Sequence, residues 1–157
     1  GLPTVETHRN MDTRLAICEL IAANTDMILV GDTYINESTQ KVMKDFQEGF
    51  VSLKAEAPAE LRGKVLHDRI DASDFVYRVL GTRGSALLGG EVSTTTRAVG
   101  EINQANVRYG RYQGEIEIAK EELPADERQN VVGYLLPSEI AVFTALPEGF
   151  GIQLEVE

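Results

Sequence analysis

The sequence predicts two kinds of structure in one chain of 157 residues, an α/β part followed by a mostly β part. Up to Gly49, apolar residues recur at helical spacing on either side of one short, continuous apolar run. From Phe50 onward, apolar and polar residues alternate, which is typical of strands with one buried face. We therefore expect an α/β part at residues 1–49 and a β part at residues 50–157.

The first strand and helix are expected at the beginning of the chain. Residues 1–6 predict a short extended segment, and residues 11–23 carry apolar side chains at helical spacing. Asn10 or Asp12 can cap the start of this helix, because their side chains accept hydrogen bonds from its first free N–H groups. Asn24 fits its end. These residues predict one strand–helix unit.

A second strand and helix follow at once. Residues 26–32 form a near-continuous apolar run bounded by acidic residues, as expected for a strand buried on both faces of a parallel sheet. The next helix begins at Asn36 and ends at Gly49. Two such units cannot close a parallel barrel. We therefore expect this part to belong to a larger α/β domain, completed by upstream sequence or by another chain.

The β part predicts a small barrel or sandwich of at least five antiparallel strands. The expected strands cover residues 50–56, 99–102, 116–118, 131–136 and 152–156. Turns are expected at residues 103–106 and 124–126. A short helix from Ser138, as its cap, to Ala145 is expected to plug one end, while residues 71–80 stay open between helix and strand.

Composition excludes several classes of protein. The net charge of −10 repels nucleic-acid backbones, and no apolar run approaches the roughly 18 residues of a membrane span. Cys18 lies on an apolar helix face and is expected to be a core residue, and His8 and His67 are far apart, so we expect no metal site. The glycine-rich residues 81–90 lack nucleotide-binding spacing, and we expect no nucleotide cofactor there.

Polar side chains after the expected strands are candidates for chemistry. Glu6 and His8 follow the first strand and Asp32 follows the second. Neighbouring parallel strands lie about 4.8 Å apart, so Glu6 and Asp32 could face one ligand as the two carboxylates of a glycosidase. The alternative is structural: Asp32 caps the following turn and Glu6 pairs with Arg9.

A second candidate site lies in the β part. Arg108, Tyr109, Arg111 and Tyr112 surround a glycine and run into the alternating strand that begins near Glu115. We interpret this block as a contact for an anion or a sugar, although the same side chains could cover a sheet edge. Further arginines that suit a phosphate, or alternatively surface ion pairs, are Arg69, Arg78, Arg83 and Arg97.

Several segments together resemble the bacterial 6-phospho-N-acetylmuramidase family, almost from the first residue to the last. The most specific is the pattern RYxGE followed by LPxDERxNVVG, at residues 111–115 and 123–133 with the preceding arginine and tyrosine at 108–109. The other matching segments are residues 1–9, 30–32, 67–72 and 97–102. One departure is Asp68, where the family leads us to expect Asn.

The resemblance implies a two-domain enzyme with a TIM-like barrel followed by a cyclophilin-like β barrel. This chain would then hold the last two βα units of the first domain and the whole of the second. The implied reaction is cytoplasmic hydrolysis of the β-1,4 bond between N-acetylmuramic acid 6-phosphate and N-acetylglucosamine in peptidoglycan recycling, without a cofactor. The partner is therefore a phosphorylated amino-sugar disaccharide; a homo-oligomer is left open.

From the residues and the resemblance together, we expect Glu6 and Asp32 to be catalytic. The expected substrate-binding residues are His8, Arg69, Arg97, Tyr109, Arg111, Tyr112 and Glu115. Two alternatives remain open: a noncatalytic β module that acts as a lid, docking or oligomerisation domain, and a small-molecule-binding domain.

Overall fold

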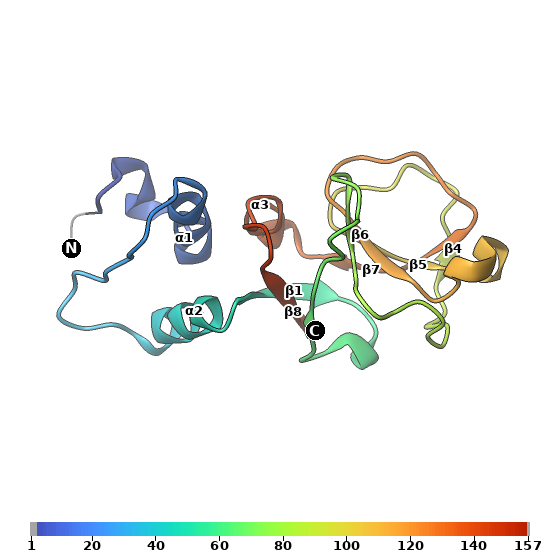
Figure 1. Ribbon diagram of the computed structural model, residues 1–157, viewed down its shortest axis with the longest axis horizontal. Coiled ribbons are helices and arrows are strands. Elements are labelled where there is room, and N and C mark those ends of the chain that lie inside the picture. The colour runs from blue at the N-terminus through green and yellow to red at the C-terminus, as the bar shows by residue number, and fades with distance from the viewer. Residues whose placement is uncertain (1–2, 157) are drawn as a thin grey trace.

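Helices dominate the amino-terminal part of this computed structural model, which describes residues 3–156 (Figure 1). A 3-10 helix, η1 (Glu6–Asn10), precedes α1 (Thr13–Ala22) and α2 (Glu37–Gln47). As expected, Asp12 caps α1 by accepting from the Arg14 N–H, and Asn36 caps α2 by accepting from the Thr39 N–H. The expected helices and their ends are confirmed.

The two expected strands of this part do not form among the described residues. Residues 26–32 are irregular, and the side chains of Met27 and Leu29 are 70% and 80% exposed. Pro3 to Val5 is also irregular and Glu6 begins η1, while Gly1 and Leu2 lie outside the described residues. Both strands are absent from the described residues for a physical reason: a parallel strand needs neighbouring strands for its backbone hydrogen bonds, and the described residues place none beside it.

The carboxyl-terminal part is a curled sheet of eight strands (Figure 1). Along the chain the strands are β1 (Phe50–Glu56), β2 (Val65–Leu66), β3 (Val76–Arg78), β4 (Glu91–Val92), β5 (Glu101–Ala105), β6 (Ile116–Ala119), β7 (Gln129–Leu135) and β8 (Gly151–Val156). Their order is β2-β8-β1-β7-β5-β6-β3, and β4 pairs with β7. Between them lie η2 (Ala59–Leu61), η3 (Val107–Tyr112), η4 (Pro137–Glu139) and α3 (Ile140–Thr144).

Two expectations about the strands are corrected. β1 and β8 pair in parallel, whereas all strands of this part were expected to be antiparallel. β5 runs on through Asn103 and Gln104, where a turn was expected. These polar residues fit in a strand because the Gln104 side chain has its own partners, such as the Leu88 N–H at 2.8 Å.

The short carboxyl-terminal helix differs in detail from the prediction. It begins with the 3-10 turn η4, which starts at Pro137, and continues as α3. Ser138 does not cap it: its hydroxyl donates to the Glu139 carboxylate instead. The open segment 71–80 contains the short strand β3.

The hydrophobic core lies on one face of the curled sheet, under α3. It is built from the inward side chains of β1, β5, β6 and β8 together with Tyr77 and Phe143. Tyr77 donates its buried hydroxyl to the Leu66 carbonyl at 2.8 Å, so a polar atom is satisfied inside this core. Cys18 is fully buried as expected, and burial raises the pKa of its thiol to about 11.

The amino-terminal helices pack against this β part. The rings of Phe46 in α2 and Phe150 before β8 lie 5.6 Å apart. Arg14 of α1 binds both the Ser52 carbonyl of β1 and the Glu139 carboxylate. Hydrophobic and charged contacts therefore both join the two parts.

Candidate functional site

The strand β6 carries acidic side chains on the face opposite the core. Ile116 and Ile118 point into the core, whereas Glu115 and Glu117 alternate with them on the other face. Both glutamates are nevertheless buried, with only 6% and 7% of their surface exposed. Buried carboxylates need partners, because transferring a charge from water into a protein is costly unless it is paired.

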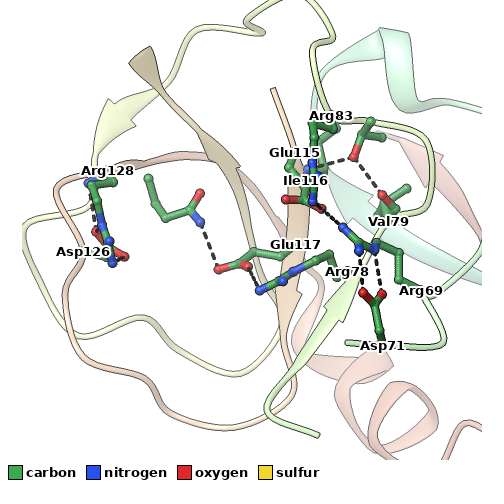
Figure 2. A network of polar contacts seen from close by, with 12 residues as sticks. Arg69, Asp71, Arg78, Val79, Arg83, Glu115, Ile116, Glu117, Asp126 and Arg128 are labelled. Atoms are coloured by element: carbon green, nitrogen blue, oxygen red, sulfur yellow. Dashed lines mark hydrogen bonds and ion pairs between the residues drawn. The ribbon is translucent and has the colours of Figure 1, made fainter. Parts of the chain in front are cut away.

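Glu117 is held from three directions. Its Oε1 accepts from Arg97 Nη1 at 2.6 Å and from Gln129 Nε2 at 3.1 Å. Its Oε2 lies 3.5 Å from Arg78 Nη2, as Figure 2 shows. Arg97 is itself 8% exposed, so this is a buried ion pair. The arrangement fixes the Glu117 carboxylate in one orientation.

Glu115 is held by a second set of arginines. Its Oε1 accepts from Arg69 Nη1 at 2.6 Å and lies 3.4 Å from Arg83 Nη2. Figure 2 shows the Arg69 guanidinium between Glu115 and Asp71, whose two carboxylate oxygens accept at 2.9 and 2.6 Å. The Arg69 guanidinium lowers the pKa of Asp71.

The 3-10 segment η3 covers the two glutamates with tyrosine rings. Asn106 caps it by accepting from the Arg108 N–H, and Gly110 adopts φ 58°, a left-handed conformation that favours glycine. This turn sets the Tyr109 and Tyr112 rings edge to face with their centroids 5.5 Å apart. The interleaved block of the sequence is thus a kinked cover over the strand.

Arginines lie against both of these rings. The guanidinium carbon of Arg128 is 4.4 Å from the centre of the Tyr109 ring. The corresponding carbons of Arg83 and Arg111 are 4.6 and 4.8 Å from the centre of the Tyr112 ring. Cations at such distances are attracted to the aromatic face.

A small polar pocket lies between β6 and η3, and we take it as the candidate site. Its volume is about 160 Å³, and its walls are formed by Arg78, Ala105, Tyr109, Tyr112, Glu115, Glu117 and Gln129. A larger groove of about 860 Å³ is lined by Arg69 together with His67 and Phe150. Buried carboxylates, arginines and aromatic rings converge at the smaller pocket.

Unpartnered polar atoms mark the same place. Arg78 Nε and Gln129 Oε1 belong to the pocket walls, and Asn103 Oδ1 lies on the neighbouring strand β5, opposite Glu117. All three are buried and have no hydrogen-bond partner among the described residues. Since buried polar groups in proteins are nearly always paired, these atoms leave hydrogen-bonding capacity at the pocket.

The described residues form no cluster of metal-ligating side chains. Among residues 3–156, no group of three or more His, Cys, Asp or Glu side chains is placed to hold a metal ion. No helix in the same range combines the length and apolar character needed to cross a membrane.

The structure brings together most of the site residues expected in the β part. Tyr109, Tyr112 and Glu115 line the pocket, and Arg111 contacts Tyr112. Arg69 and Arg97 lie behind the pocket and hold the two glutamates.

The candidates in the amino-terminal part lie elsewhere. Glu6 and His8 belong to η1, near the amino-terminal end of the molecule's long axis and away from β6 (Figure 1). Glu6 accepts two hydrogen bonds from Arg9 at 2.7 and 2.8 Å, and His8 Nε2 lies 2.9 Å from Glu19 Oε2. Asp32 is exposed in the irregular segment between α1 and α2.

The sequence did not point to Glu117, Asn103, Ala105 or Gln129 as parts of the pocket or its wall. It offered Arg78 for a phosphate or a surface ion pair, but not as a partner of Glu117. The alternation of Glu115 and Glu117 with isoleucines predicts a half-buried strand, in which these glutamates lie on the face away from the core. A signal for the glutamates existed in the excess of arginines in the same part of the chain. For Asn103 and Gln129 we find no such signal.

Two family models match this chain. A family model described as 6-phospho-N-acetylmuramidase, C-terminal, matches residues 50–155, and the corresponding N-terminal model matches residues 1–45. A search of curated proteins finds no match.

Two solved structures share the fold. One is a conserved protein from Enterococcus faecalis with an unknown function, with 27% identity and a TM-score of 0.74 over 99% of this chain and 44% of that one. The other is an uncharacterized B. cereus protein, with 22% identity and a TM-score of 0.67 over 98% of this chain and 47% of that one. The chain thus spans less than half the length of both.

Proposed function

Because this chain belongs to the 6-phospho-N-acetylmuramidase family, we propose that it forms part of a glycoside hydrolase. The reaction is cleavage of the bond between N-acetylmuramic acid 6-phosphate and N-acetylglucosamine, in the cytoplasm, during peptidoglycan recycling. The enzyme uses no cofactor.

Two domains are part of this proposal. Residues 1–49 belong to a TIM-like barrel, of which they supply the last two βα units, and residues 50–157 form a cyclophilin-like β domain. Two separate family models, matching residues 1–45 and 50–155, support this division. So does the exposure of Met27 and Leu29, because a neighbouring barrel strand would cover such apolar side chains.

The observation that carries the proposal is the concentration of arginines around one pocket of an acidic chain. Six of the ten arginines of the sequence contact its walls: Arg69, Arg78, Arg83, Arg97, Arg111 and Arg128. On a chain of net charge −10, an anionic ligand requires such a local cluster. Tyrosine rings and buried carboxylates beside it suit a sugar, whose ring stacks and whose hydroxyls donate.

In this assignment the pocket is a binding site for a phosphorylated sugar, and the reaction belongs to the amino-terminal part, which lies apart from the pocket (Figure 1). Tyr109, Tyr112, Glu115 and Arg111 contact the sugar, and Arg69 and Arg97 hold the glutamates in place. This supports a role for Glu115 and Glu117 in binding, because carboxylates fully engaged by guanidinium groups are poor proton donors.

Glu6 and Asp32 are the proposed catalytic carboxylates, with His8 as a substrate contact beside Glu6. The Arg9 guanidinium lowers the pKa of Glu6. A carboxyl group with a lowered pKa suits the nucleophile or base of a glycosidase rather than its general acid.

The test is hydrolysis of the phosphorylated disaccharide by the complete protein. Glu6→Gln and Asp32→Asn are each expected to lower kcat at least hundredfold, the contribution typical of one acid, base or nucleophile. Asp26→Asn, a change of the same kind in the same irregular segment as Asp32, is the matched control and should leave kcat unchanged. Wild-type kcat in both Glu6→Gln and Asp32→Asn would refute the catalytic assignment.

A noncatalytic role of the β part is the second candidate, acting as a lid or docking module. It is favoured by one observation: both buried carboxylates of the pocket are already engaged by arginines. The variant Glu115→Gln distinguishes a substrate-binding pocket from a noncatalytic lid or docking module. If the pocket binds substrate, KM rises with little change in kcat; if the β part only docks or covers, both stay at the wild-type value.

A further inference from the structure

We propose that the phosphate of a phosphorylated sugar is received by Arg83 and Arg111 at the Tyr112 ring, and not by Arg69 or Arg97. The identity of the ligand as a sugar phosphate rests on the proposed function. The choice between the arginines rests on which of them are exposed and lack a close carboxylate. Arg78, although its Nε has no partner among the described residues, is only partly exposed and forms part of the pocket wall.

Most arginines around the pocket are already engaged by carboxylates. Arg69 donates to both oxygens of Asp71 and to Glu115, with all three distances at or below 2.9 Å. Arg128 donates to both oxygens of Asp126 at 2.8 Å. Arg97 is buried and donates to Glu117 and to the Pro124 carbonyl. A phosphate at any of these would have to displace a carboxylate from a formed ion pair.

Arg83 and Arg111 differ from this group. Arg83 lies 3.4 Å from Glu115 Oε1, the same oxygen that Arg69 holds at 2.6 Å, so its attraction to that carboxylate is the weaker of the two. Arg111 has no ion pair among residues 3–156, and its Nη2 donates to the Tyr112 hydroxyl at 2.7 Å. Both side chains therefore keep guanidinium N–H groups for a ligand, and both reach solvent.

The Tyr112 ring brings these two cations together. Their guanidinium carbons lie 4.6 and 4.8 Å from the ring centre, so they are at most 9.4 Å apart, the sum of the two distances. Each guanidinium group presents paired N–H donors beside the ring, and such donors match the oxygens of a phosphate. The Tyr112 hydroxyl adds a third donor, because it accepts from Arg111 and keeps its own proton to donate.

The pocket lined by Tyr112 carries hydrogen-bond acceptors, whereas the two arginines are hydrogen-bond donors. Its walls present the carboxylates of Glu115 and Glu117 and the unpartnered Gln129 Oε1, all hydrogen-bond acceptors. Sugar hydroxyls donate to such acceptors. Donors at the mouth and acceptors inside thus match a molecule with an anionic group at one end and hydroxyls at the other, as in a sugar 6-phosphate.

Calorimetric titration of the complete protein with N-acetylglucosamine 6-phosphate and with N-acetylglucosamine tests the assignment. These two probes differ only in the phosphate. Wild type is expected to bind the phosphorylated sugar at least tenfold more tightly. Arg83→Ala and Arg111→Ala should each weaken that binding about tenfold, the usual effect of losing a charge-assisted hydrogen bond, and leave N-acetylglucosamine binding unchanged.

Two further variants separate recognition from packing. Arg108→Ala is the matched control, because Arg108 lies in the same segment η3 but is paired with Glu127 at 2.9 Å; it should keep the phosphate preference. Tyr112→Phe keeps the ring and removes the hydroxyl, and should weaken binding of the phosphorylated sugar about fivefold. Thermal unfolding of each variant checks that it is folded.

A phosphate preference that survives in the Arg83→Ala/Arg111→Ala double variant would overturn the assignment. Hydrolysis of the disaccharide by wild type is measured separately and decides the proposed function. If wild type does not hydrolyse it but the preference depends on Arg83 and Arg111, the phosphate site stands and the glycosidase does not. Hydrolysis by wild type together with an unchanged preference in the double variant would support the glycosidase and refute the phosphate site.

Discussion

At the scale of residues, the Glu117 carboxylate joins three separate segments of the chain. It collects one contact from β3, one from the loop before β5 and one from β7, through Arg78, Arg97 and Gln129. None of these residues is near it in sequence. The charge of this carboxylate therefore balances a guanidinium that the fold has buried.

Replacing Glu117 by Gln should lower the free energy of unfolding by about 3–5 kcal/mol, because Arg97 is then left buried without a counter-charge. Urea unfolding measures the effect. Glu121→Gln, an exposed glutamate beyond the end of the same strand, is the control and is expected to change stability by less than about 0.5 kcal/mol. Equal unfolding midpoints for the two variants would contradict a stabilising role for the buried pair.

At the scale of elements, the sheet depends on the close approach of β7 to the end of β1, with which it pairs. Gly133 lies in β7, one residue from Tyr134, which pairs with Glu56 of β1. A Cβ atom at Gly133 would lie 2.3 Å from the Glu56 carbonyl oxygen and 3.0 Å from the Ala57 Cα. These are backbone atoms, which cannot rotate away. A side chain at Gly133 would therefore keep the two strands from lying as close as they do.

We expect Gly133→Ala to destabilise the protein by about 1–3 kcal/mol, the typical cost of forcing an extra methyl group into a packed region. The measurement is the midpoint of chemical unfolding. Gly31→Ala provides the control, since a Cβ atom there meets nothing within 4 Å. The explanation fails if Gly133→Ala is as stable as Gly31→Ala.

At the scale of the whole molecule, ion pairs and apolar contacts tie the helical part to the β part. Arg14 of α1 binds Glu139, and these side chains are only 17% and 4% exposed. Asp12 and Glu139 both raise the pKa of Arg14, which stays charged. The pair therefore couples α1 to the start of α3 across the two parts of the chain.

A double-mutant cycle on Arg14→Ala and Glu139→Ala should give a coupling energy of about 1–3 kcal/mol in chemical unfolding. The comparison pair is Lys44 and Glu48, exposed on α2 with 3.7 Å between their charged atoms, where about 0.3–0.5 kcal/mol is expected. A coupling for Arg14 and Glu139 no larger than this would mean that the pair does not hold the parts together.

The sequence by itself determined the local features of this protein. It predicted both amino-terminal helices, the first with a cap at Asn10 or Asp12 and the second beginning at Asn36. It also predicted the strands around 50–56, 116–118 and 152–156 and the candidate block 108–112. Caps, turns and periodicity depend on residues a few positions apart. A short segment of sequence therefore predicts these features without reference to the rest of the fold.

Only the tertiary structure decided which strands meet and which charges are buried. The parallel pairing of β1 with β8 and the burial of Glu115 and Glu117 depend on residues far apart in the sequence. The apolar run at 26–32 had the composition of a strand and stayed irregular, because a strand requires a neighbour. In the same way, alternation with isoleucine predicts an exposed glutamate. Burial of that glutamate is favourable only where an arginine from elsewhere in the chain pairs with it.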